Sequence, residues 1–190
     1  MTRHPNTRRA ILDLAESFLQ EKGFNGFSYT HIAAELGVKN AAIHYHFPTK
    51  EALGCAVVQR YRDRFQLWTN NSRVRDLSPE QKLDWFFKIY ADTRADHGKV
   101  CLAGSLETEF NSIPATLREQ TEGLTRELLA WLETALKEGR DAGVFRFGGD
   151  PAAKAALILA SLQGALQMAR ALDTRKFHAV LLQNKQDLLA

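Results

Sequence analysis

The stretch Ser28–Lys50 constrains this chain more than any other, because it predicts two short helices joined by a tight turn. Ser28 is a favourable N-cap for the first helix, and Gly37 can supply the left-handed conformation that ends it. The second helix is only about two turns long and would be marginal in isolation. We therefore expect tertiary packing, through Ile43 and Phe47, to hold this second helix in place.

The outward face of the second helix carries side chains that can read base pairs. Lys39, Asn40, Ala41 and His44 point away from the apolar positions that fix the angle between the two helices. An α-helix fits the major groove, where Asn can pair with adenine, Lys with guanine, and Ala can approach a thymine methyl group. Polar residues on either side, and the start of the next helix, are placed to bind phosphates. The expected DNA contacts are Ser28, Thr30, Lys39, Asn40, Ala41, His44, Tyr45, His46, Thr49 and Lys50.

The rest of the chain shows helical periodicity and no convincing alternating strand pattern. Ser78-Pro79 and Asp150-Pro151 mark helix starts, because a capping residue precedes a proline in the first turn. Residues 70–77 are polar and predict a loop. We expect an all-α fold of about nine helices, with a three-helix head followed by a larger helical bundle.

Residues 8–54 closely resemble the DNA-binding domain of TetR-family transcriptional regulators. The matching residues are Ala15, Phe18, Gly23, Ile32, Ala33, Gly37, Val38, His46, Phe47, Lys50, Glu51 and Leu53. The resemblance implies a helix-turn-helix DNA-binding domain over residues 1–48. It also implies a ligand-binding and dimerisation domain over residues 49–190, with helix 49–69 as the connector. Ala41 stands where the family often has Gly, and His44 where it often has Tyr, so the operator sequence stays open.

Composition argues against several other classes of protein. The formal net charge of +3 is mildly basic and suits an anionic partner about as well as an ordinary surface. Cys55 and Cys101 are too few for a disulfide framework, and neither they nor His44 and His46 have the spacing of a metal site. The most apolar run, residues 155–162, is shorter than the roughly 20 residues that span a bilayer. We expect a cytoplasmic protein without metal or cofactor, and not an enzyme.

The predicted helix over residues 152–172 is apolar nearly all the way round, which is unusual for a surface helix. One side can line its own bundle, and the side with small residues can meet a symmetry mate. The expected dimer contacts are Leu157, Ala160, Ser161, Gly164, Ala165 and Met168. A central helix in a monomeric bundle is the alternative. A dimer is favoured because one short helix reads too few bases for useful specificity.

The resemblance also places an effector cavity in the larger domain. The candidate sensor residues are Trp85, Phe86, Tyr90, Cys101, Glu107, Phe110, Trp131, Gln163 and Gln167. The segment around Cys101, KVCLAGSLETE, resembles a branch of electrophile-responsive, N-ethylmaleimide-sensing-like regulators in which a cysteine in this context is modified. Lys99 and a helix N-terminus would favour the thiolate. The alternative is that Cys101 is a small buried apolar side chain.

These features predict a ligand- or electrophile-responsive transcriptional regulator. We expect a repressor that binds a pseudo-palindromic operator as a dimer and is released by a small-molecule effector. Three alternatives stay open: an architectural DNA-binding protein that senses no ligand, a small helical enzyme, and an activator.

Overall fold

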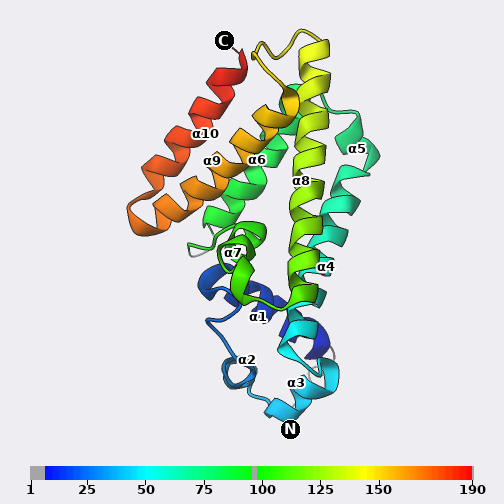
Figure 1. Cartoon of the computed structure of the whole chain (residues 1–190), viewed down its shortest axis with the longest axis vertical. Coiled ribbons are helices and arrows are strands. Elements are labelled where there is room, and N and C mark those ends of the chain that lie inside the picture. The colour runs from blue at the N-terminus through cyan, green and yellow to red at the C-terminus, as the bar shows by residue number, and fades with distance from the viewer. Residues whose placement is uncertain (1–6, 96–97, 190) are drawn as a thin grey trace. The chain divides into compact units, whose positions relative to one another are not determined.

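The computed structural model describes residues 7–95 and 98–189, and in these residues every regular element is a helix (Figure 1). They form ten α-helices and one short 3₁₀ helix, which confirms the all-α prediction. The short helix α5, Ser72–Arg75, lies in the stretch predicted as a loop. The Asn71 side chain caps it by accepting a hydrogen bond from the Arg73 N–H at 2.9 Å, and Val74 is buried. The polar composition of this stretch gave no sign of that buried contact.

Packing divides the described residues into two compact units, which are residues 7–64 with 102–124, and residues 65–95 and 98–101 with 125–189. The first unit holds α1 (Thr7–Lys22), α2 (Tyr29–Leu36), α3 (Asn40–His46), most of α4 (Lys50–Thr69), α7 (Leu102–Thr108), η1 (Phe110–Ser112) and the start of α8 (Ala115–Asp141). The second holds the ends of α4 and α8 together with α5, α6 (Pro79–Ala95), α9 (Pro151–Ala171) and α10 (Thr174–Leu189). The functional boundary between residues 48 and 49 stays a prediction.

Local sequence signals begin and end the helices as predicted. Gly23 and Gly37 adopt left-handed φ angles of 77° and 63° at the ends of α1 and α2. Ser78 and Gln81 form a reciprocal capping box, in which the Ser78 N–H donates to Gln81 Oε1 and the Gln81 N–H donates to Ser78 Oγ. Asp150 caps α9, and its side chain accepts a hydrogen bond from a backbone N–H in the first turn.

The core of the first unit is built on one apolar stripe of α1. Ile11, Ala15 and Leu19 follow each other at intervals of four residues, and all three are fully buried. Ile32 of α2 and Ile43 of α3 are also fully buried, and the three helices pack against one another. This packing gives α3, which is too short to be stable alone, its fixed position.

An aromatic cluster anchors the second unit. The Trp131 ring of α8 stacks on Phe86 of α6, with 5.4 Å between ring centroids, and lies 4.8 Å from the ring of Trp68 at the end of α4. Tyr90 extends the cluster from Phe86 at 5.4 Å. Such ring contacts add to the burial of large apolar surfaces and bind three helices together.

Helices α9 and α10 run side by side in the second unit (Figure 1). The Asn184 amide of α10 donates to Ser161 Oγ of α9 at 2.9 Å, and Phe177 is buried. By length and composition α9 could cross a membrane, but a core helix of a soluble protein passes the same test. The helix predicted over residues 152–172 nearly matches α9, but only its apolar run at residues 155–162 had been compared with the thickness of a bilayer.

Candidate DNA-binding site and sensor region

The angle between α2 and α3 is fixed by a buried contact as well as by apolar packing. The Tyr29 hydroxyl, at the start of α2, donates to the Phe47 carbonyl oxygen at the end of α3, with an O–O distance of 2.8 Å. Only 8% of the Tyr29 surface is exposed, and burial raises the pKa of its phenol to about 12. The phenol therefore stays protonated and keeps donating throughout the neutral range.

The outward face of α3 presents the residues predicted to read bases. Lys39, Asn40 and Ala41 are all exposed, and so is Tyr45, the predicted phosphate contact, which is 84% exposed. The Asn40 amide lies 3.4 Å from the hydroxyl of Thr30, which is also exposed, so two predicted contacts from α2 and α3 lie together. The first turn of α3 is thus a polar surface on a helix whose other face is buried.

His44 is exposed but held in one orientation. Its ring lies edge-on to Tyr29, with 4.7 Å between centroids, and its Nδ1 lies 3.2 Å from the Pro48 carbonyl oxygen. A carbonyl only accepts hydrogen bonds, so Nδ1 must carry the proton in this contact. In the neutral ring Nε2 is therefore an acceptor, which can pair with the exocyclic amino group of adenine or cytosine.

Several predicted phosphate contacts have additional structural partners. Thr49 is exposed and caps α4 by accepting a hydrogen bond from a backbone N–H. His46 is half-buried beside the Tyr45 ring. The Ser28 N–H donates to His31 Nδ1 at 3.2 Å, a capping role for His31 that the sequence analysis did not anticipate.

Lys50 differs most from its predicted placement. Its ammonium is half-buried and donates to the Phe27 carbonyl oxygen at 2.5 Å, instead of extending to solvent. It also lies over the rings of Phe24 and Phe27, at 4.5 and 4.6 Å from their centroids. Burial lowers the pKa of Lys50, and the charge of Glu109 partly opposes that shift. In this structure the ammonium therefore binds within the first unit, and its contact with phosphate stays a prediction.

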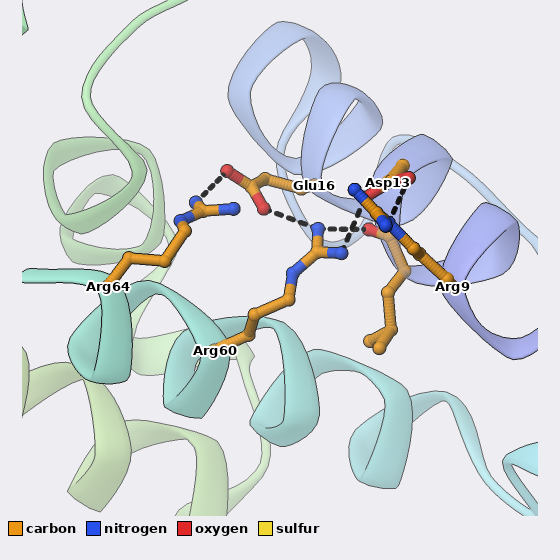
Figure 2. Close-up of polar contacts among 6 residues, drawn as sticks. Arg9, Asp13, Glu16, Arg60 and Arg64 are labelled. Atoms are coloured by element: carbon orange, nitrogen blue, oxygen red, sulfur yellow. Dashed lines mark hydrogen bonds and ion pairs between the residues drawn. The ribbon is translucent and has the colours of Figure 1, made fainter. Parts of the chain in front are cut away.

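An ionic network that the sequence analysis also missed joins α1 to α4 (Figure 2). Arg60 of α4 pairs with Asp13 at 2.6 Å and with Glu16 at 2.5 Å, and Arg64 pairs with the other oxygen of Glu16. The side chain of Glu16 is only 14% exposed, and its two oxygens pair with two different arginines. No local pattern pairs residues 44 to 48 positions apart, which is why sequence reasoning did not find it.

The predicted sensor residues divide into three groups. Phe86, Tyr90 and Trp131 meet in the aromatic cluster, and the Cys101 thiol is buried at 3.8 Å from the Tyr90 hydroxyl. Gln163 belongs to the same unit, and its buried Nε2 has no hydrogen-bond partner among the described residues. Glu107 and Phe110 belong to the first unit and are half-buried. Trp85, which is 47% exposed, and Gln167, also exposed, point to the surface and do not line an internal cavity as predicted.

A small cavity of about 170 Å³ lies in the second unit at the ends of α4, α5, α6 and α8. Its wall combines Trp131 and Val74 with the charged side chains of Arg75, Lys82 and Glu138. Lys82 and Glu138 pair with each other at 2.7 Å. Trp131 is the only predicted sensor residue on this wall. Among the described residues no group of three histidine, cysteine or acidic residues is placed to hold a metal ion.

The predicted dimer residues fall on two faces of α9. Leu157, Ala160, Gly164 and Met168 are exposed and follow the spacing of one helical face. Ala165 is fully buried within its own unit, and Ser161 is half-buried and bonded to α10. Positions 161 and 165 therefore share the helix face that turns into the unit, and the dimer contacts on the exposed face stay a prediction.

Comparison with known proteins agrees with this helical arrangement. The profile described as bacterial regulatory proteins, tetR family, matches residues 11–57. The profile described as tetracyclin repressor-like, C-terminal domain, matches residues 79–183, which is more than half of the chain. The chain belongs to the TetR family of transcriptional regulators. Regulators of this family bind DNA operators and small-molecule effectors, typically as dimers.

This TetR-family chain matches its relatives over most of their length. It is 26% identical to the transcriptional repressor DhaR of Mycobacterium sp. strain GP1 over 87% of this chain and 83% of that protein. It is 24% identical to the repressor NemR of Escherichia coli K12 over 84% of this chain and 82% of that protein. A solved TetR regulator from Legionella pneumophila superposes with a TM-score of 0.84 at 31% identity, covering 98% of this chain and 100% of the other. The reduced form of E. coli NemR gives a TM-score of 0.79 at 22% identity, covering 96% of this chain and 97% of the other.

Proposed function

We propose that this TetR-family regulator is a cytoplasmic repressor that binds a pseudo-palindromic operator as a homodimer and dissociates when an effector binds. The observation that carries the proposal is the exposed polar start of α3, where Lys39, Asn40 and Ala41 project from a helix whose Ile43 side is buried. A helix presented in this way matches the way recognition helices enter the major groove. The family assignment makes DNA the expected partner of that surface.

Dimerisation would present a second α3 helix to the second half-site of the operator. Leu157 and Met168 on α9, and Leu182 and Leu189 on α10, are exposed by 42–59%. Two neighbouring helices with exposed large apolar side chains favour association with a second copy over a solvated surface. A twofold axis would place two α3 helices about 34 Å apart, which is one turn of DNA.

Release requires an effector that favours one conformation over the other. The aromatic cluster and the adjoining cavity support a small ligand with an aromatic or apolar part, which would lie against Trp131. Helix α4 contributes residues to both packing units, so a change at its C-terminal end can reach the head through one continuous helix. We propose that effector binding shifts α4 and thereby the spacing of the two heads.

Selection of bound sequences from random duplex DNA tests the DNA-binding part of the proposal. We expect the protein to select an inverted repeat and its affinity to fall steeply as salt rises, because phosphate contacts release counterions. A screen of aromatic, fatty and electrophilic compounds for release of that DNA tests the effector part. A chain that selects no sequence refutes the repressor assignment, and selection without any releasing compound refutes effector control.

Cys101 is the proposed site of electrophile sensing, and Cys55 offers a matched control. Cys55 is more exposed than Cys101, but partial burial and the nearby Glu51 carboxylate raise the pKa of its thiol, which lowers its reactivity. We expect N-ethylmaleimide to release DNA from the wild type and from Cys55→Ser, and to leave Cys101→Ser bound. Release of the Cys101→Ser protein would show that the thiol is a packing group.

A further inference from the structure

We propose that Lys50 and Glu109 are positioning residues for DNA binding, and that together they clamp the loop between α1 and α2. This loop, residues 23–27, leads directly into Ser28 at the start of the helix-turn-helix. The inference rests on the proposed DNA-binding function, and it gives Lys50 a role other than contact with phosphate. Lys50, Glu109 and the loop that they contact all lie within the first packing unit.

Glu109, which follows α7, forms one arm of the clamp. Its Oε2 accepts hydrogen bonds from the Phe24 N–H at 2.5 Å and the Asn25 N–H at 3.2 Å. Phe24 and Asn25 lie in the loop after α1, outside the helical hydrogen-bond pattern, and a carboxylate is a strong acceptor for their N–H groups. A Cβ at Gly23 would lie 2.7 Å from Glu109 Oε1, so only glycine lets the carboxylate approach this closely.

Two further contacts hold the same segments together. The Asn25 side-chain amide donates to Ser112 Oγ at 3.0 Å. The buried Ser105 hydroxyl of α7 donates to the Leu19 carbonyl oxygen at 2.6 Å, near the C-terminal end of α1. The segment from α7 to η1 therefore provides hydrogen-bond partners to the end of α1 and to the loop that follows it.

Lys50, the first residue of α4, forms the other arm. Its ammonium donates to the Phe27 carbonyl oxygen and lies over the Phe24 and Phe27 rings, so it contacts both ends of the loop. The Glu109 carboxylate attracts the same ammonium. A cation that is half-buried with these partners is not extended toward a DNA backbone.

The two arms fix where α2 and α3 start relative to α4 and α7. The buried rings of Phe24 and Phe27 anchor the loop by its side chains, while Gly23 and Gly26 leave its backbone able to adopt other conformations. Without the clamp the head would sample more orientations, and binding DNA would require ordering it again. The proposal therefore predicts weaker binding without the loss of any phosphate contact.

The salt dependence of DNA affinity separates this role from direct contact. The probe is the operator selected by the wild-type protein, and the variants are Lys50→Met and Glu109→Gln. We expect each variant to bind about tenfold more weakly, with the slope of log affinity against log salt unchanged. A lost phosphate contact would instead make that slope shallower by about 0.9. For Glu109→Gln the predicted loss of DNA affinity is opposite in sign to a purely electrostatic effect. Removing an acidic group near DNA would by itself leave binding equal or stronger.

Glu119→Gln, on an exposed position of α8 in the same unit, is the matched control, and we expect it to bind like the wild type. The double variant Lys50→Met with Glu109→Gln should lose less affinity than the product of the two single losses, because both act on one loop. Hydrogen exchange at Phe24 and Asn25 should speed up in each variant while amides of the α1 core stay protected. That pattern shows a released loop in a folded head.

The outcomes separate the two proposals. A wild-type chain that selects no operator overturns the proposed function, and the positioning role with it. Wild-type binding combined with a shallower slope for Lys50→Met, or with unchanged affinity for Glu109→Gln, overturns the clamp alone. Fully additive losses in the double variant would also contradict it.

Discussion

Replacing Tyr29 by Phe tests how α3 is held against α2. The Tyr29 phenol has a pKa of about 12 in the folded protein against 10.0 in the free side chain. The folded state therefore keeps a proton that the unfolded chain loses between pH 10 and about pH 12. The stabilisation that the protonated Tyr29 phenol contributes is fully present below pH 10 and is lost as pH rises through the folded pKa. A shift of this size corresponds to about 2 to 3 kcal/mol of unfolding free energy.

Urea unfolding of the wild type and of Tyr29→Phe, compared across alkaline pH, measures this contribution. Near neutral pH we expect the variant to be less stable by about 1 kcal/mol, because the hydrogen bond to Phe47 is lost. At higher pH the wild type should lose stability faster, so the difference shrinks and then reverses. Tyr45→Phe is the matched control, since Tyr45 is 84% exposed. A difference between wild type and Tyr29→Phe that stays constant with pH would refute the reasoning.

Three other changes have expected outcomes. Gly139→Ala should lower the melting temperature, with a cost of about 1 to 3 kcal/mol, because the new Cβ would lie 2.1 Å from the Phe145 ring; a melting curve that matches the wild type would contradict this packing. Arg60→Gln should destabilise the protein by about 1 to 3 kcal/mol in chemical unfolding, because Glu16 loses one of its two cations; an equal loss for Arg73→Gln, an exposed arginine of α5, would show that the network has no special role. Leu157→Glu should give a monomer by light scattering, because the residue is 59% exposed on the proposed dimer face; a dimer of undiminished stability would place the interface elsewhere.

The helix boundaries could be predicted because their causes are local. A left-handed glycine at Gly23 or Gly37, or the capping pair at Ser78 and Gln81, acts within a few residues of its own position. The outward face of α3 was predicted for the same reason, since apolar Ile43 fixes which side is buried. Both the fold class and the proposed recognition surface could therefore be predicted from the periodicity of apolar residues.

The roles that sequence reasoning did not find depend on partners far away in the chain. Lys50 was assigned to phosphate because of its place at a helix start, whereas its ammonium lies against Phe27, more than twenty positions earlier. Arg60 and Glu109 had no assigned role, since their partners lie 44 to 85 positions away. Trp85 was placed in a cavity because the family resemblance puts the effector cavity among these helices, but it lies on the exposed side of α6.

The most direct test of DNA reading by α3 compares the sequences selected from random duplex DNA by the wild type and by Asn40→Ala. We predict an inverted repeat with half-sites about one helical turn apart for both proteins. The variant should lose base preference at one position in each half-site and keep the spacing, because Asn40 is exposed at the first position of α3. Identical selected sequences for the two proteins, or no base preference in the wild type, would contradict the account.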